Sequence, residues 1–187
     1  YLIRDIDEEM YRKVSESRHD LSEEEARKIA KIIGLSAIKY GDLSNQASKD
    51  YIFDIDRFTS FEGDTGPYIL YTIVRIKSIL AKYQEQGKSL ENLCLEEAQG
   101  ASEKDLMRQL CSFNAMMDSA CEETAPHKIC AYIYDLANAF NKFYHETKIL
   151  AEEDQKKQAG WIALLKLTKE VLETCIDVLG FSAPDRM

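Results

Sequence analysis

The sequence has 187 residues, of which 45% are hydrophobic and only eight are glycine and three proline, so it suits one main packed domain with a smaller element and few flexible linkers. Its 24 basic and 33 acidic residues give a net charge of −9, the wrong sign for a protein that grips nucleic-acid phosphates indiscriminately. Without an apolar run that could cross a bilayer or a signal-peptide pattern, we expect a cytoplasmic protein with neither membrane nor DNA as a partner.

The first third of the chain predicts two helices and one short extended segment. A helix is expected over residues 4–17, and a second opens at Ser22, where Glu25 stands three residues later in a capping-box pattern. Gly34 is expected to end this second helix. Residues 50–55 combine β-branched and aromatic side chains, which favours an extended segment.

The rest of the chain predicts a helical bundle. Pro67 suits a first helical turn, so a helix should run from there to about Gln86, capped by Asp64 or Thr65. After a weakly patterned connection, three further helices follow over residues 102–122, 126–146 and 154–179. The apolar row expected to bury the last of these is Trp161, Leu164, Leu165, Leu172, Ile176 and Leu179. The predicted fold class is therefore mainly α.

The helix from Pro67 carries an unusual polar face. At about 100° per residue, Tyr68, Tyr71, Arg75 and Lys82 gather on the side opposite its isoleucine row. Aromatic rings stack on bases and cations meet phosphates, so this face suits an unpaired nucleic-acid loop. The alternative is that the tyrosines pack against a neighbouring helix.

A second polar stripe lies on the helix from Pro126. Tyr134, Asn138, Asn141 and His145 fall within roughly 60° of one another and away from the apolar row. Side-chain amides in that position could read base edges. A solvated or helix-packing face explains the same stripe equally well.

Several blocks of this sequence resemble the arginyl-tRNA synthetases in order and spacing. They are residues 34–44 (GLSAIKYGDLS), 50–56 (DYIFDID), 60–80 (SFEGDTGPYILYTIVRIKSIL), 136–144 (LANAFNKFY) and 178–187 (VLGFSAPDRM). Together they span nearly the whole chain. The resemblance implies a helical bundle of the DALR anticodon-binding type over residues 66–187, preceded over residues 1–65 by a smaller helical connective element that contains the extended segment.

The resemblance also implies a function. The full-length enzyme would join arginine to its tRNA with ATP and magnesium, and this chain would bind the anticodon loop of arginine tRNA beside the catalytic domain of the same polypeptide. No His-x-Gly-His motif and no phosphate-binding glycine loop occur here, so we expect no catalytic residue, metal or cofactor in this fragment and no activity of its own. The rival interpretation is a structural helical module that docks the catalytic domain without touching RNA.

The candidate tRNA-binding residues come from the polar stripes and from the regions that surround the anticodon loop in this family. They are Tyr68, Tyr71, Arg75, Lys82, Asn138, Asn141, His145, Ile149 and Met187. Many family members have Gln and Ala where this chain has Leu70 and Thr72, and a common arginine is replaced by Trp161. A base contact from that Gln is therefore not expected, and Trp161 is expected in the core.

One short motif points to a different chemistry, and the cysteines need a separate account. Asp64-Thr65-Gly66 matches the aspartic protease triplet, but that reaction needs two facing carboxylates at strand ends, whereas a helix follows here. The cysteines, at spacings without a C-x-x-C pair, are expected to be reduced and mostly buried thiols. They are Cys94, Cys111, Cys121, Cys130 and Cys175.

Overall fold

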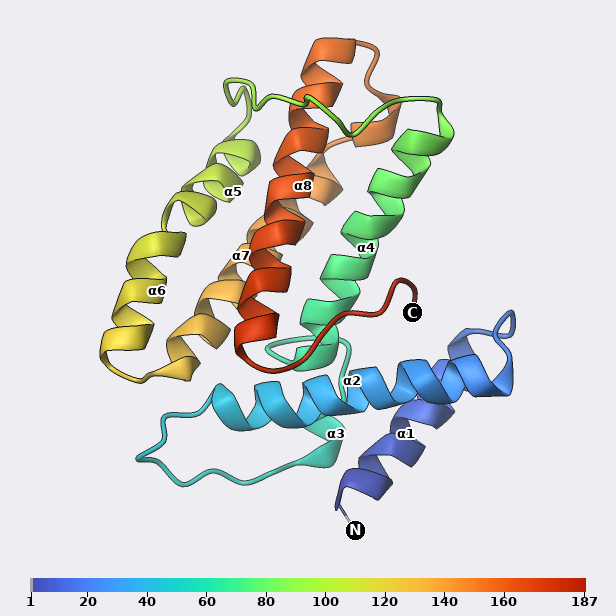
Figure 1. Cartoon of the computed structure of the whole chain (residues 1–187), viewed down its shortest axis with the longest axis vertical. Coiled ribbons are helices and arrows are strands. Elements are labelled where there is room, and N and C mark those ends of the chain that lie inside the picture. The colour runs from blue at the N-terminus through green and yellow to red at the C-terminus, as the bar shows by residue number, and fades with distance from the viewer. Residues whose placement is uncertain (1) are drawn as a thin grey trace.

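The computed structural model describes residues 2–187 and consists of helices and their connections (Figure 1). The chain begins with a helical pair, α1 (Leu2–Ser17) and α2 (Glu23–Leu43). α1 buries Ile6, Met10 and Val14. The capping box predicted for α2 is confirmed, because the side chains of Ser22 and Glu25 each accept a hydrogen bond from the other residue's main-chain N–H. Tyr1, part of the predicted first element, lies outside the described residues.

The prediction that Gly34 ends the second helix is wrong. α2 passes through Gly34 and continues to Leu43. A Cβ at this position would lie 3.0 Å from Asp7 Oδ1 and 3.3 Å from Ile6 Cγ2, both on α1. The glycine therefore allows α1 and α2 to approach closely, and it keeps a right-handed helical backbone.

The predicted extended segment over residues 50–55 is also wrong, because none of residues 2–187 forms a β-strand. β-branched and aromatic residues favour a strand only where a neighbouring strand can pair with it, and none is present in the described part of the chain. Ile52 is instead 88% exposed. Asp54 accepts a hydrogen bond from the Arg57 N–H and caps a single turn, α3 (Ile55–Phe58).

The bundle begins with α4 (Gly66–Glu85), which starts where the sequence predicts. The Thr65 side chain caps it by accepting a hydrogen bond from the Tyr68 N–H. A Cβ on Gly66 would lie 2.2 Å from the Ser36 carbonyl oxygen of α2, so only glycine fits. This contact places the start of α4 directly against the middle of α2.

The single helix predicted over residues 102–122 is two helices, α5 (Ala101–Cys111) and α6 (Phe113–Glu122), and the first is capped by Gly100. At the break, the Ser112 hydroxyl donates to the Arg108 carbonyl and its N–H donates to the Gln109 carbonyl. Serine bonds of this type bend helices, and a bond to the third preceding carbonyl tightens the turn.

α7 (Pro126–Glu146), a short 3-10 turn η1 (Ile149–Ala151) and α8 (Gln155–Val178) complete the bundle. The apolar row predicted for α8 is confirmed as buried, Trp161 included. Gly180, at φ +84°, follows the C-cap residue Leu179 and ends α8. The chain then crosses the bundle toward the turn between α1 and α2 (Figure 1).

The cysteine prediction is only partly right. Cys130 and Cys175 are buried in the bundle, whereas Cys94, Cys111 and Cys121 are exposed. The last two lie on α5 and α6, which form the edge of the bundle and so keep one face in solvent. Within residues 2–187, no helix combines the length and apolar character needed to span a membrane.

Candidate nucleic-acid interface

The polar stripes of α4 and α7 meet where these two helices pack together. The Asn141 side-chain amide donates to Tyr68 Oη at 2.9 Å and to Thr72 Oγ1 at 3.1 Å. Tyr68 Oη donates in turn to Asn138 Oδ1 at 2.7 Å. We call Tyr68, Thr72, Asn138 and Asn141 the amide network. Asn141 is only 8% exposed, so both of its amide hydrogens are used inside the protein.

Burial also changes the acidity of the Tyr68 hydroxyl in this network. Desolvation raises the pKa of Tyr68, so its hydroxyl is neutral at physiological pH and can donate to Asn138 while accepting from Asn141. The ring of Tyr68 packs edge-on against Tyr134, with 5.9 Å between the ring centroids. The network is therefore a closed, satisfied contact between the two helices.

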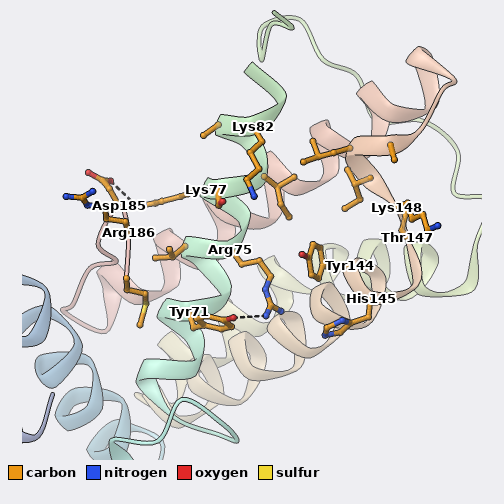
Figure 2. A pocket seen from close by; sticks show the side chains of 18 of the residues that line it. Tyr71, Arg75, Lys77, Lys82, Tyr144, His145, Thr147, Lys148, Asp185 and Arg186 are labelled. Atoms are coloured by element: carbon orange, nitrogen blue, oxygen red, sulfur yellow. Dashed lines mark hydrogen bonds and ion pairs between the residues drawn. The ribbon is translucent and has the colours of Figure 1, made fainter. Parts of the chain in front are cut away.

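Arg75 joins this network to an open surface. Its guanidinium donates to Asn141 Oδ1 at 2.5 Å and to Tyr71 Oη at 3.1 Å. The guanidinium carbon lies 4.7 Å from the ring centroid of Tyr71 and 5.0 Å from that of Tyr144 (Figure 2). Cation–π attraction to two rings and two hydrogen bonds hold the side chain in one orientation.

Beside Arg75 opens a groove of about 1000 Å³. Its lining comes from the outer face of α4 between Tyr71 and Lys82, from the segment 144–151 at the end of α7 and after it, and from residues 185–187 (Figure 2). Arg18 also belongs to the lining. Residues far apart in the sequence thus form one concave surface.

The groove is basic although the chain is acidic. Its lining holds six basic residues and a single carboxylate, Asp185. The basic residues are Arg18, Arg75, Lys77, Lys82, Lys148 and Arg186. Arg75, Lys82 and Lys148 form no ion pair with any residue from 2 to 187, so their charges are free to meet an anion. Positive charge is concentrated here on a protein of net charge −9.

The structure divides the predicted site residues into two groups. Those that line the groove are Tyr71, Arg75, Lys82, His145, Ile149 and Met187. Tyr71 is 41% exposed, whereas Ile149 is 4% exposed and adds only an apolar edge. Tyr68, Asn138 and Asn141 belong to the amide network. Tyr68, Tyr71 and Arg75 are each at least partly exposed, as the helical spacing predicts.

The groove also contains residues that were not predicted from the sequence, among them Tyr144, Lys148 and Arg18. Tyr144 stacks on Phe140 one turn before it and presents its other side to Arg75. The sequence does hold a signal for Tyr144, because it is an aromatic residue next to His145 at the predicted end of a helix. Lys148 follows the same helix end. For Arg18 no sequence signal exists, because its place in the groove depends on its contact with Met187, far away in the chain.

The groove suits a planar anionic ligand. Residues 2–187 contain no cluster of His, Cys, Asp or Glu that could hold a metal ion. Asp64 of the protease-like triplet accepts a hydrogen bond from Tyr40 Oη, and Thr65 caps α4. Exposed rings beside free cations instead match the two parts of a single-stranded nucleotide, its base and its phosphate.

Two family models match the chain in succession. The model described as the DALR anticodon binding domain matches residues 69–187, well over half of the chain. The model described as the catalytic domain of class I (R) tRNA synthetases matches residues 2–55. Every residue of the groove except Arg18 falls within the first match.

Curated and solved proteins agree with these matches. The arginine–tRNA ligase of Agathobacter rectalis is 61% identical over 194 residues, which cover 100% of this chain and 32% of that protein. The arginyl-tRNA synthetase structures of Thermus thermophilus and Plasmodium falciparum superpose with TM-scores of 0.88 and 0.87 at 26% and 25% identity. Each superposition covers all of this chain, together with 32% of the Thermus thermophilus chain and 33% of the Plasmodium falciparum chain. The chain spans about a third of the length of the curated relatives it matches.

Proposed function

This chain belongs to the DALR anticodon binding domain family of arginyl-tRNA synthetases, and we propose that its groove binds the anticodon loop of an arginine tRNA. The observation that carries this proposal is the guanidinium of Arg75, held between the rings of Tyr71 and Tyr144 at the wall of a basic groove. Rings and a planar cation at one edge suit unstacked bases, and the anticodon loop is a single-stranded segment that can present them.

Each groove residue has a distinct role in this proposal. Tyr71 and His145 offer ring faces for bases, while Arg75 hydrogen-bonds a base edge. Lys82 and Lys148 neutralise backbone phosphates, because both cations are free of ion pairs with the described residues. The residues Ile149 and Met187 supply the apolar edge, and the amide network holds the wall without contacting RNA.

The parent protein would be an arginine–tRNA ligase that uses ATP and magnesium. We assign residues 1–65 to a connective element that bridges the catalytic domain and the tRNA, and residues 66–187 to the bundle that binds the anticodon. The gap between the two family matches, at residues 56–68, supports a division near residue 65. The sequence lacks the nucleotide-binding motifs, so this chain alone should not catalyse arginine-dependent ATP–pyrophosphate exchange.

The rival function is a structural module that docks the catalytic domain without contacting RNA. The amide network favours it to some degree, because it shows that much of the polar face between α4 and α7 serves packing. Titration of the chain with an arginine tRNA and with the same tRNA changed only in its anticodon separates the two. Equal affinities for both would refute anticodon recognition by the groove.

Tyr71 gives the sharpest mutational test. We expect Tyr71→Ala in the full-length enzyme to lower kcat/KM for tRNA by about five- to hundredfold, since a base–aromatic stack contributes about 1–3 kcal/mol. ATP-dependent arginine binding should remain unchanged. Tyr71→Phe is the matched control, because it keeps the ring and should keep most of the activity. Thermal unfolding of both variants shows whether the substitution has disturbed the bundle.

A further inference from the structure

The last residues of the chain form a strap that is held by three distant parts of the molecule. We call residues 180–187 the C-terminal strap. Lys77 of α4 donates to the Pro184 carbonyl at 3.3 Å. Arg186 forms an ion pair with Glu25 at the start of α2, at 2.7 Å. At the end of the strap, Arg18 donates to the Met187 main-chain oxygen at 2.9 Å.

Arg18 is held in place by its neighbour before it reaches the strap. Its Nε and Nη2 donate to the two carboxylate oxygens of Asp20, both at 2.7 Å. This paired contact fixes the plane of the guanidinium. Nη1 is left to donate to Met187. Asp20 balances the positive charge of Arg18. Arg18 therefore contributes a fixed hydrogen-bond donor to the groove and not a free cation.

We propose that Arg18 is a positioning residue for RNA recognition, which holds the end of the C-terminal strap so that Met187 stays at the edge of the groove. The inference rests on the proposed function for its RNA readout. A segment without helix or strand is poorly ordered unless side chains tie it down. A strap that is ordered before binding spares the ligand the entropic cost of ordering it. Arg18 lies in the segment that matches the catalytic-domain model, so that segment would contribute to the anticodon groove.

The test compares Arg18→Ala with Arg12→Ala in the full-length protein. Arg12 lies on α1, the helix that ends just before Arg18, and pairs with Glu9 and Glu16, outside the groove, so it is the matched control. The probe is the anticodon stem-loop RNA of an arginine tRNA. We expect Arg18→Ala to weaken its binding by about three- to tenfold and Arg12→Ala to leave it unchanged.

Two further readouts separate positioning from a merely structural role. Amide hydrogen exchange of residues 181–187 should be faster in Arg18→Ala than in the control. In the Met187→Ala background, Arg18→Ala should have almost no additional effect on RNA binding, since the Met187 side chain that Arg18 positions is then absent. If Arg18→Ala disturbs folding, Asp20→Asn loosens the same guanidinium and should give a smaller change in the same direction.

Several results would overturn the proposal. Unchanged exchange in the strap would mean that Arg18 does not hold it. Additive losses in the double variant, with a shallower salt dependence of binding, would mean that Arg18 contacts a phosphate directly. If the unmodified protein does not bind the stem-loop, the proposed function fails, and the exchange measurement still decides whether Arg18 positions the strap.

Discussion

The amide network and the groove are adjacent regions of one polar face, and they use similar side chains in opposite ways. In the network, hydroxyls and amides from α4 and α7 bond to each other across the interface between the two helices. In the groove, Tyr71, Lys82 and His145 are exposed and line a concave surface, so they can meet a ligand. What separates a packing contact from a binding surface is the presence of a partner across the helix interface.

Arg75 belongs to both regions, because it donates to Asn141 on one side and lines the groove on the other. Substitutions in the two regions should therefore have different effects. Changes in the network should affect the stability of the fold and, through Arg75, RNA binding. Changes in the groove should affect RNA binding alone.

The largest effect is expected for Asn141→Ala. The substitution removes the amide that bonds to Tyr68, Thr72 and Arg75 in a buried place, so the free energy of unfolding should fall by about 1–3 kcal/mol. Asn138→Ala is the control, since Asn138 is exposed and should cost well under about 1 kcal/mol. Urea denaturation measures both. Equal losses for the two variants would show that the burial of Asn141 adds nothing to its contribution to stability.

Arg75→Ala should act mainly on RNA. We expect about a tenfold loss of affinity for the anticodon stem-loop, because one charged, planar contact is removed and Asn141 loses a partner. Arg75→Lys should not restore binding, since an ammonium cannot take the flat position between the two rings. Binding isotherms for the two variants check this. Full rescue by lysine would reduce the role of Arg75 to its charge.

Lys82 and Lys148 should change the salt dependence of binding. Each lysine that meets a phosphate adds about 0.7 to the slope of log affinity against log salt for a single-stranded ligand. Lys82→Gln and Lys148→Gln should each lower the slope by about that amount. Lys104→Gln on α5 is the control, because Lys104 is exposed and lies outside the groove. A slope that falls equally in all three variants would refute a local phosphate site.

The smallest effect is expected at the thiols. Burial raises the pKa of Cys130 and of Cys175 to about 12, so both stay protonated and unreactive at neutral pH while the protein is folded. Alkylation at pH 8 should modify the three exposed cysteines, Cys94, Cys111 and Cys121, and spare the buried pair. Mass spectrometry counts the labels. RNA should not alter the pattern, whereas Asn141→Ala should speed modification of Cys130 if the network keeps α7 closed.

The sequence was sufficient for the family, the order of the helices and the faces they bury, because caps and apolar rows are local signals. The family match over residues 69–187 confirms the resemblance drawn from the blocks. The helix boundaries at Gly34 and Ser112 were predicted wrongly. Each depends on a tertiary contact or a local hydrogen bond that the apolar periodicity does not reveal.

The site was less predictable than the fold. Helical spacing placed Tyr71 and Arg75 on the outer face, but it could not show that Asn141 turns toward α4, because that depends on how the two helices approach each other. Arg18 could not be found at all, since it meets a residue 169 positions away in the chain. Contacts between distant segments can be predicted only once the fold is known.

The uneven distribution of charge has a consequence for how the molecule meets RNA. Six of the 24 basic residues and one of the 33 acidic residues line the groove, which leaves 18 basic and 32 acidic residues on the rest of the protein. A polyanion that approaches another face is repelled, and one that approaches the groove is attracted. The field therefore orients the RNA before any contact forms, and it discourages long nucleic acids from adhering elsewhere. Such a surface favours short, productive encounters among the many other RNAs of a cell.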